Sequence, residues 1–273
     1  MLDYAFMRDA FLAATVVAVV AGATGFFLVL RGQTFAGHAL AHVGFTGATG
    51  AVLVGVAPLW GLVAVTVGAG LGMGLLGERW TQRDVAIGMV LAMALGLGML
   101  FLHFYTSFAS EATSLLFGNV LAVSAGTVWV LAALGAAALA ALAVISRPLL
   151  FASLQPELAE ARGVSTRLYA SLFLVVVAVA AAATAQIVGV LLVFALMVGP
   201  AATAQRLTRR IGAGVLLSVA LAVIESWAGI TLAYYTDWPT SFGIVAASGM
   251  VFLATVLPST NHRHGRAPRE RTS

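Results

Sequence analysis

The chain has 273 residues, with no cysteine and no lysine, and only 9% of its residues are charged. Without cysteine it can form neither a disulfide nor a thiolate metal site. Without lysine it has no Walker A loop, because the lysine of that loop reaches the nucleotide phosphates. If ATP drives this protein, a different chain must hydrolyse it. The charged fraction is far below the roughly 25% of soluble domains, which argues against a water-soluble fold.

Apolar residues are abundant instead: they make up 61% of the chain, and the mean hydropathy is +1.03. Runs of about 20 apolar residues recur, each long enough to cross ~30 Å of hydrocarbon. We therefore expect an all-α polytopic membrane protein with one transmembrane domain, residues 1–260, and a basic, disordered tail, residues 261–273. The run Ala10–Leu30 is too long for a signal-peptide core and is interpreted as the first span. Nine spans are expected, at residues 10–30, 34–57, 59–77, 85–104, 127–145, 168–186, 187–205, 211–235 and 241–257.

The basic residues indicate an orientation in the membrane rather than nucleic-acid binding. With nine spans, thirteen of the fourteen arginines fall on one side, and only Arg8 lies on the other. The positive-inside rule makes the arginine-rich side cytoplasmic, with the N-terminus outside and the C-terminus inside. The tail carries an H-x-H pair, His262 and His264, which could bind metal. Its four arginines favour contact with anionic lipid.

Two connecting segments are more polar than the rest. Phe104–Gly126 lies outside in this topology and is expected to contain a short interfacial or re-entrant helix, because irregular backbone at membrane depth needs protein or water around it. Ser146–Arg167 is the longest internal connection. Within it, Pro156 at the start and Gly163 after the end predict a short cytoplasmic helix over 156–162.

The histidines His38 and His42 are the strongest candidates for chemistry. Four residues turn a helix by roughly 400°, so both imidazoles lie on one face. Imidazole suits zinc, and also manganese or iron in mixed nitrogen and oxygen sites. The alternative is that each histidine hydrogen-bonds a neighbouring helix. Since two ligands do not complete a site, further ligands could come from a symmetry-related chain or from the remaining candidates: His103, Glu111, Glu225 and Asp237.

Each remaining candidate has a structural interpretation as well. Glu225 is the most deeply placed carboxylate, so it is protonated, paired or lining a wet path. Asp237 precedes Pro239 by two residues and resembles a turn residue, whereas His103 is isolated. Glycines recur at small-xxx-small spacing, which allows helix backbones to approach closely in a membrane. They are Gly44, Gly47, Gly50, Gly68, Gly70, Gly72 and Gly74.

Six segments together resemble the membrane subunit of the bacterial ABC importers for zinc, manganese or iron, over about residues 24 to 257. One departure stands out: His38 occupies the position of the usual aspartate in the family's G-D-x-L-x-H motif, while His42 keeps the histidine. Exchanging a hard carboxylate for imidazole favours zinc over manganese. The matching segments are FLVLRGQTFAGHALAHVGFTGATGAVLVG, DVAIGMVLAMALGLGML, LLFGNVLAVS, PELAEARGVS, IVGVLLVFALMVGPAATAQRLT and YYTDWPTSFGIVAASG.

The resemblance implies a permease without enzymatic activity of its own in the bacterial plasma (inner) membrane. It implies a homodimer with two cytoplasmic ATP-binding subunits and an extracytoplasmic metal-binding protein. The substrate would be a divalent metal ion, with zinc favoured and manganese or iron open, and no cofactor would be permanently bound. A segment of the internal connection would dock on the ATPase. It comprises Pro156, Glu157, Leu158, Ala159, Glu160, Ala161, Arg162 and Gly163.

Two other classes of function are compatible with parts of the sequence. A secondary transporter or channel for divalent metal would work without an ATPase, but we find no inverted repeat with paired broken helices. An intramembrane metallo-hydrolase would want an H-E-x-x-H helix, and the H-x-x-x-H of His38 and His42 lacks the glutamate.

Overall fold

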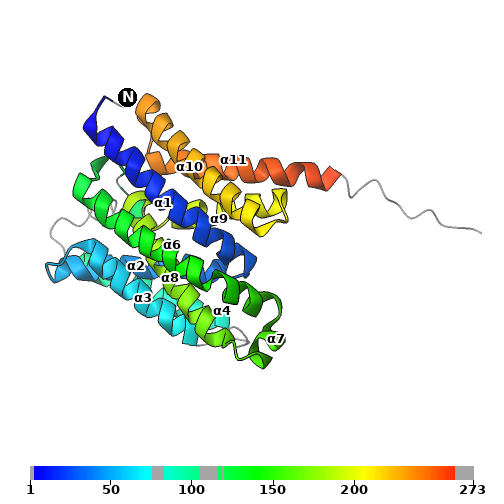
Figure 1. Cartoon of the computed structure of the whole chain (residues 1–273). Coiled ribbons are helices and arrows are strands. Elements are labelled where there is room, and N and C mark those ends of the chain that lie inside the picture. Colours follow the sequence, from blue (N-terminus) through cyan, green and yellow to red (C-terminus); the bar gives the residue numbers. More distant parts are fainter. Residues whose placement is uncertain (1–2, 76–82, 105–115, 119, 262–273) are drawn as a thin grey trace, which may run out of the picture.

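The computed structural model describes residues 3–75, 83–104, 116–118 and 120–261, and in these ranges the chain is helical, with no strand (Figure 1). The side chains of residues 83 and 258–261 are excepted from the description. In chain order the elements are α1 Ala5–Leu30, α2 Thr34–Leu53, α3 Pro58–Leu75, α4 Arg83–His103, the 3-10 turn η1 Val120–Ala122, α6 Ala125–Leu154, α7 Pro156–Ala161, α8 Thr166–Val188, α9 Val193–Leu207, α10 Ile211–Thr236 and α11 Thr240–Asn261.

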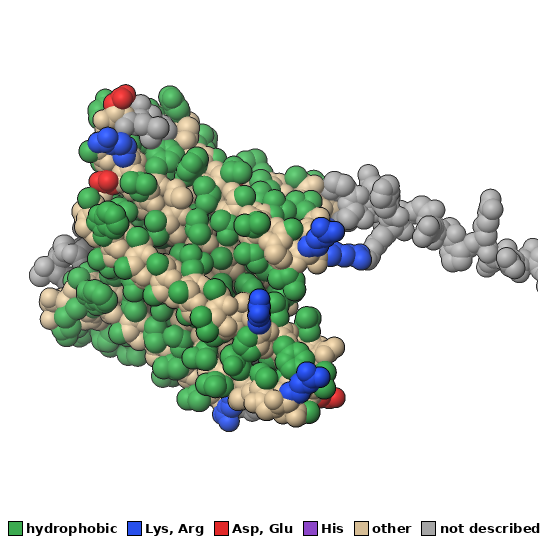
Figure 2. All heavy atoms as spheres, in the orientation of Figure 1, with side chains coloured by type: hydrophobic (Ala, Val, Ile, Leu, Met, Phe, Trp, Pro, Cys, Tyr) green, Lys and Arg blue, Asp and Glu red, His purple; other side chains and the backbone are tan. Residues whose placement is uncertain are grey.

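Among the described residues, seven helices are long and apolar enough to cross a membrane: α1, α3, α4, α6, α8, α10 and α11. The prediction of nine spans is therefore not confirmed as a count. Helix α9 has 15 residues, about 22 Å, and α2 is diluted by histidine, glycine and threonine. Figure 2 shows charged side chains gathered at two ends of the molecule, with a broad apolar band between them. This distribution is that of a multi-pass membrane protein.

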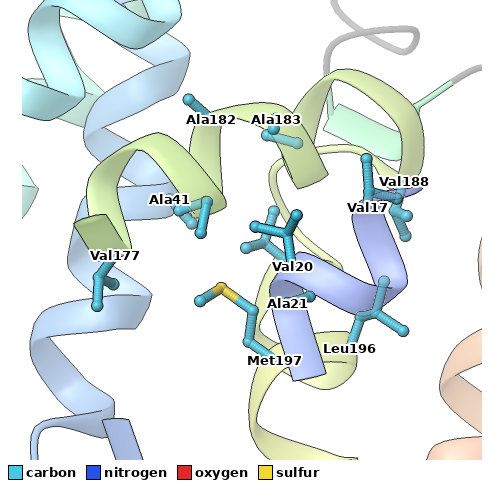
Figure 3. Packing of buried hydrophobic residues seen from close by; sticks show 14 of the residues in the cluster. Val17, Val20, Ala21, Ala41, Val177, Ala182, Ala183, Val188, Leu196 and Met197 are labelled. Atoms are coloured by element: carbon cyan, nitrogen blue, oxygen red, sulfur yellow. The ribbon is translucent and has the colours of Figure 1, made fainter. Parts of the chain in front are cut away.

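Helices α1 and α8 form the centre of the structure. Their most apolar windows are 72% and 78% buried within the protein, whereas the other five candidate spans are 22–33% buried. Alanine side chains fill much of the contact, which lets the backbones approach closely. Helix α9 completes the contact (Figure 3). The labelled residues include Val17, Val20 and Ala21 of α1, Val177, Ala182 and Ala183 of α8, and Leu196 and Met197 of α9.

The end of α6 was predicted wrongly. The helix does not end at residue 145 but continues through Pro148 to Leu154. A proline inside a helix removes one backbone donor and its ring crowds the carbonyl four residues earlier, but in a membrane helix neighbouring groups can satisfy the freed carbonyl. The predicted long polar connection is therefore the last turns of α6 followed at once by α7. Helix α7 has proline at its first position, and Gly163 follows it with a φ of +78°.

The start of α9 was also predicted wrongly: it begins at Val193, not at residue 187. Helix α8 stops at Gly189, whose φ of +87° is a left-handed conformation that favours glycine. A Cβ on Gly189 would lie 2.3 Å from the backbone nitrogen of Gly118, so the two backbones are in direct contact. The backbone N–H of Leu191 donates to the Leu116 carbonyl at 3.2 Å. Most of the interfacial or re-entrant helix expected between 104 and 126 lies outside the described residues.

Candidate metal centre on helix α2

A tight turn fixes the start of α2 against the end of α1. The turn consists of Arg31, Gly32 with a φ of +64°, and Gln33. The backbone N–H of Gln33 donates to the Leu28 carbonyl at 3.0 Å, and Gly37 donates back to the Gln33 carbonyl at 3.1 Å. The first turns of α2 are thus held by backbone hydrogen bonds, and the histidines follow directly.

The structure brings His38 and His42 together, as the spacing predicts. Their ring centroids are 4.5 Å apart and the rings meet edge to face at 80°. His42 is 8% exposed, and its Nδ1 has no hydrogen-bond partner among the described residues. Buried polar atoms are almost always paired, so an unpaired nitrogen here is available to a ligand. The ring separation allows both imidazoles to reach one ion at nitrogen–metal distances of about 2.1 Å.

A hollow of about 250 Å³ opens beside His38 and is lined by Thr34, Phe35, His38 and Phe194. Phe194 comes from the first turn of α9, and its ring centroid lies 5.2 Å from that of His38. Phe194 is in contact with His38 because α8 and α9 are separated by an irregular segment. The sequence did not predict this residue as part of the site: the predicted boundary between two spans lay at residues 186 and 187, and GVLLVFALM is continuously apolar, so nothing in it places Phe194 at a helix start.

The other predicted ligands are not gathered around the histidine pair. In the described part of the chain no three His, Asp or Glu side chains form a group able to hold a metal. His103 is exposed at the end of α4, with its ring 5.7 Å from that of Phe104. Asp237 ends α10 in a left-handed conformation, φ 56°, which matches its interpretation as a turn residue. Glu111 lies outside the described residues.

Glu225 lies on a helix that is not one of the main neighbours of α2. Its helix, α10, packs on α1, α9 and α11, whereas α2 packs mainly on α3, α4 and α8, with smaller contacts to α9 and α1. The carboxyl group is 2% exposed, and neither oxygen makes a hydrogen bond of good geometry in the described structure. Its polar neighbour is Ser248 of α11, whose hydroxyl donates to the Ala195 carbonyl of α9 at 3.3 Å. Glu225 therefore lies where α9, α10 and α11 meet, and among the described residues it does not join the two histidines in a group able to hold a metal.

Helix α7 presents a surface at one end of the molecule (Figure 1). Ala159 is fully buried and anchors the helix, while Glu157, Leu158 and Glu160 are exposed. The hydroxyl of Thr166, at the start of α8, donates to the Glu160 carboxylate at 2.8 Å. The remaining residues of the predicted docking segment lie at the two ends of α7: Pro156, Ala161, Arg162 and Gly163. An exposed leucine between carboxylates on an anchored helix is suited to docking in a groove of another protein.

Nearly the whole chain is similar to a known protein family and to proteins named as manganese transport permeases or membrane proteins. Residues 3–259 match the model of the ABC 3 transport family. The manganese transport system membrane protein MntC of Halalkalibacterium halodurans is 30% identical, over 92% of this chain and 87% of that protein. The manganese import system permease protein ScaB of Streptococcus gordonii is 28% identical, over 96% of this chain and 94% of that protein.

Two solved structures are similar in fold. PsaBC from Streptococcus pneumoniae, in complex with Fab, superposes with a TM-score of 0.82 at 27% identity, over 92% of this chain and 91% of that chain. An inward-facing metal-chelate type ABC transporter superposes with a TM-score of 0.68 at 15% identity, over 92% of this chain and 85% of that chain, a likeness of fold alone.

Proposed function

The chain belongs to the ABC 3 transport family, and we propose on that basis that it is the membrane permease of an ATP-driven importer for a divalent transition metal. Metal would enter the cytoplasm by alternating access, with the metal as substrate and no resident cofactor. The observation that carries the proposal is the pair His38 and His42 on one face of α2, beside an open hollow and with an unpaired buried nitrogen on His42.

The pair supports a step on a path better than a storage site. Transit needs ligands strong enough to replace water around the ion and weak enough to release it. Two imidazoles meet that requirement, whereas zinc bound in a structural site has four protein ligands. In a homodimer, the second copy would present the same two histidines across the path and complete the ligand set.

Manganese is the first metal to test. Imidazole in place of the family's usual aspartate favours zinc by ligand chemistry, but the comparisons give that preference no support. Relatives over nearly the whole chain are named for manganese. Manganese accepts mixed nitrogen and oxygen ligands, so backbone carbonyls and water beside the imidazoles would serve it.

The assembly that we propose follows from the same family membership. Two copies of this chain would pair with two ATP-binding subunits at residues 156–163, which comprise α7 and the two residues after it, and with a metal-binding protein on the other side. The nine predicted spans, with the N-terminus outside and the C-terminus inside, place the arginine-rich ends and α7 in the cytoplasm. The tail, residues 261–273, would follow the permease domain, residues 1–260, and rest on anionic lipid.

The decisive experiment measures metal uptake by proteoliposomes containing the complex, with manganese and zinc supplied separately. His42→Ala should lower uptake of both metals strongly, because it removes the ligand that the family motif retains. His38→Asp restores the family's usual residue and should raise manganese uptake relative to zinc. His103→Ala is the matched control, since that imidazole lies at the exposed end of α4 and is left out of the proposed site.

Two results would contradict the proposal. Uptake unchanged in His42→Ala would remove the histidine pair from the path. Uptake by the isolated chain without nucleotide would favour the alternative, a secondary transporter or channel. Loss of the co-purified ATPase on replacing residues 157–162 would, in contrast, support α7 as the docking element.

A further inference from the structure

The side chain of Arg31 joins three helices that lie far apart in the sequence. Arg31 follows the last residue of α1, in the turn before α2. Its Nη1 donates to the Leu149 carbonyl of α6 at 3.4 Å and to the hydroxyl of Ser153, also on α6. Its guanidinium carbon lies 5.5 Å from the ring centroid of Phe173, a fully buried residue of α8.

The α6 contact is close to the short helix α7. Ser153 is one residue before the end of α6, and Pro156 begins α7. The backbone between them is continuous in its hydrogen bonding: Gln155 donates to the Phe151 carbonyl at 3.0 Å, and Ala159 donates to the Gln155 carbonyl at 2.9 Å. A displacement of α7 would therefore displace the last turn of α6, where Arg31 is bound.

The α8 contact lies beyond the other end of α7. The Glu160 carboxylate accepts a hydrogen bond from Thr166, the first residue of α8, and Phe173 follows two turns later on that helix. Arg31 thus holds both helices that flank α7. On its own side, the backbone turn through Gly32 connects it to α2, where His38 lies seven residues after Arg31.

We propose that Arg31 is a positioning residue that transmits movement of α7 to the histidine-bearing helix α2, and this rests on the proposed function. Arginine suits the role because its planar fork donates to α6 while its face stacks on an aromatic ring of α8. A lipid-facing arginine would direct its donors to phosphates at the membrane surface. Here Nη1 of Arg31 donates to the end of α6 inside the protein, so a displacement of α6 would also displace Arg31.

The test uses the complete complex in proteoliposomes, with its ATPase and binding protein, and manganese chloride as the probe. Arg31→Ala should retain basal ATP hydrolysis, while manganese transported per ATP falls about tenfold or more, as expected when a charge-assisted hydrogen bond between moving parts is lost. Stimulation of ATP hydrolysis by the manganese-loaded binding protein should fall in parallel. A merely structural role would instead lower the melting temperature and the yield of assembled complex.

Two further variants make the inference sharper. Ser153→Ala removes one partner of Arg31, so it should lower transport per ATP less than Arg31→Ala, and the double variant should be no worse than Arg31→Ala alone. Arg206→Ala is the matched control. Arg206 also donates to a carbonyl of a neighbouring helix, that of Thr255 at 3.2 Å, but between α9 and α11, away from α7. Arg206→Ala should transport as much manganese per ATP as the wild-type complex.

The outcomes separate this inference from the proposed function. Wild-type transport per ATP in Arg31→Ala, or an equal fall in Arg206→Ala, would overturn the role of Arg31 while leaving the importer in place. If Arg31→Ala does not assemble, a wild-type ratio in Ser153→Ala overturns it. A wild-type complex whose ATP hydrolysis responds neither to the manganese-loaded nor to the zinc-loaded binding protein would instead refute the proposed function itself.

Discussion

Replacing Gly74 by alanine should destabilise the contact between α3 and α8. A Cβ on Gly74 would lie 2.5 Å from the Cα of Ser171 and 2.7 Å from its Cβ, where ordinary contacts need about 3.4 Å or more. Because a backbone atom is in the way, the two helices must separate. Overpacking of this kind costs about 1–3 kcal/mol.

Gly72 provides a matched control two residues away on the same helix. A Cβ on Gly72 meets nothing within 4 Å. Alanine there gains helix propensity of up to about 1 kcal/mol with no clash. The two substitutions are chemically identical and gain the same helix propensity, so the difference between them, roughly 1–3 kcal/mol, isolates the packing of α3 on α8.

The assay is thermal unfolding of the purified permease in detergent, with size-exclusion chromatography to follow loss of the folded species. Gly74→Ala should lower the melting temperature by about 3–10 °C, and Gly72→Ala should leave it unchanged or raise it. Equal melting temperatures for the two variants would refute the contact. A large loss confined to Gly72→Ala would show that another surface, not α8, determines which glycines matter.

Two further predictions concern the irregular segment and the buried carboxylate. Gly189→Ala should abolish folding, because the left-handed backbone of Gly189 and its 2.3 Å approach to Gly118 both exclude a side chain. Gly163 is left-handed too but has open space around it, so Gly163→Ala should lower the stability by only about 1–2 kcal/mol, and the yields of folded protein of the two variants test this difference. Glu225→Gln should keep transport and match or raise the melting temperature, because an isolated buried charge costs several kcal/mol; lost metal uptake would make Glu225 part of the path.

The glycines of α3 show which part of a helix contact the sequence predicts and which part it does not. Both small-xxx-small pairs, Gly68 with Gly72 and Gly70 with Gly74, are equally good in the sequence. In the structure only the second pair packs, with Gly70 near the Leu174 carbonyl and Gly74 near Ser171, while Gly68 and Gly72 have open space. The spacing predicts a close helix contact, but the rotation of α3 about its axis decides which face makes it.

The histidine pair depends on contacts within one helix, whereas the contact between Phe194 and His38 depends on contacts between helices. His38 and His42 lie together because the pitch of one helix places residues four apart on one face, so their contact is local and the sequence predicts it. Phe194 meets His38 where α9 begins after the irregular segment, and in that segment the backbones of Gly189 and Gly118 touch across about seventy residues of sequence. The sequence predicted a boundary between two spans at residues 186 and 187, but it did not predict the irregular segment that moves the start of α9 to Val193.

By itself, the sequence determined the membrane class, the positions of most helices, the histidine pair and the lack of a lysine for a Walker A loop, because each depends on composition or on spacing within one helix. The tertiary structure decided where α6 ends and α9 begins, which glycines pack, that Glu225 forms no metal-holding group with the two histidines, and that Arg31 connects α6 and α8 to α2. These features depend on contacts between segments far apart in the chain. In an apolar sequence many helix faces are equally suited to burial, so packing alone selects among them.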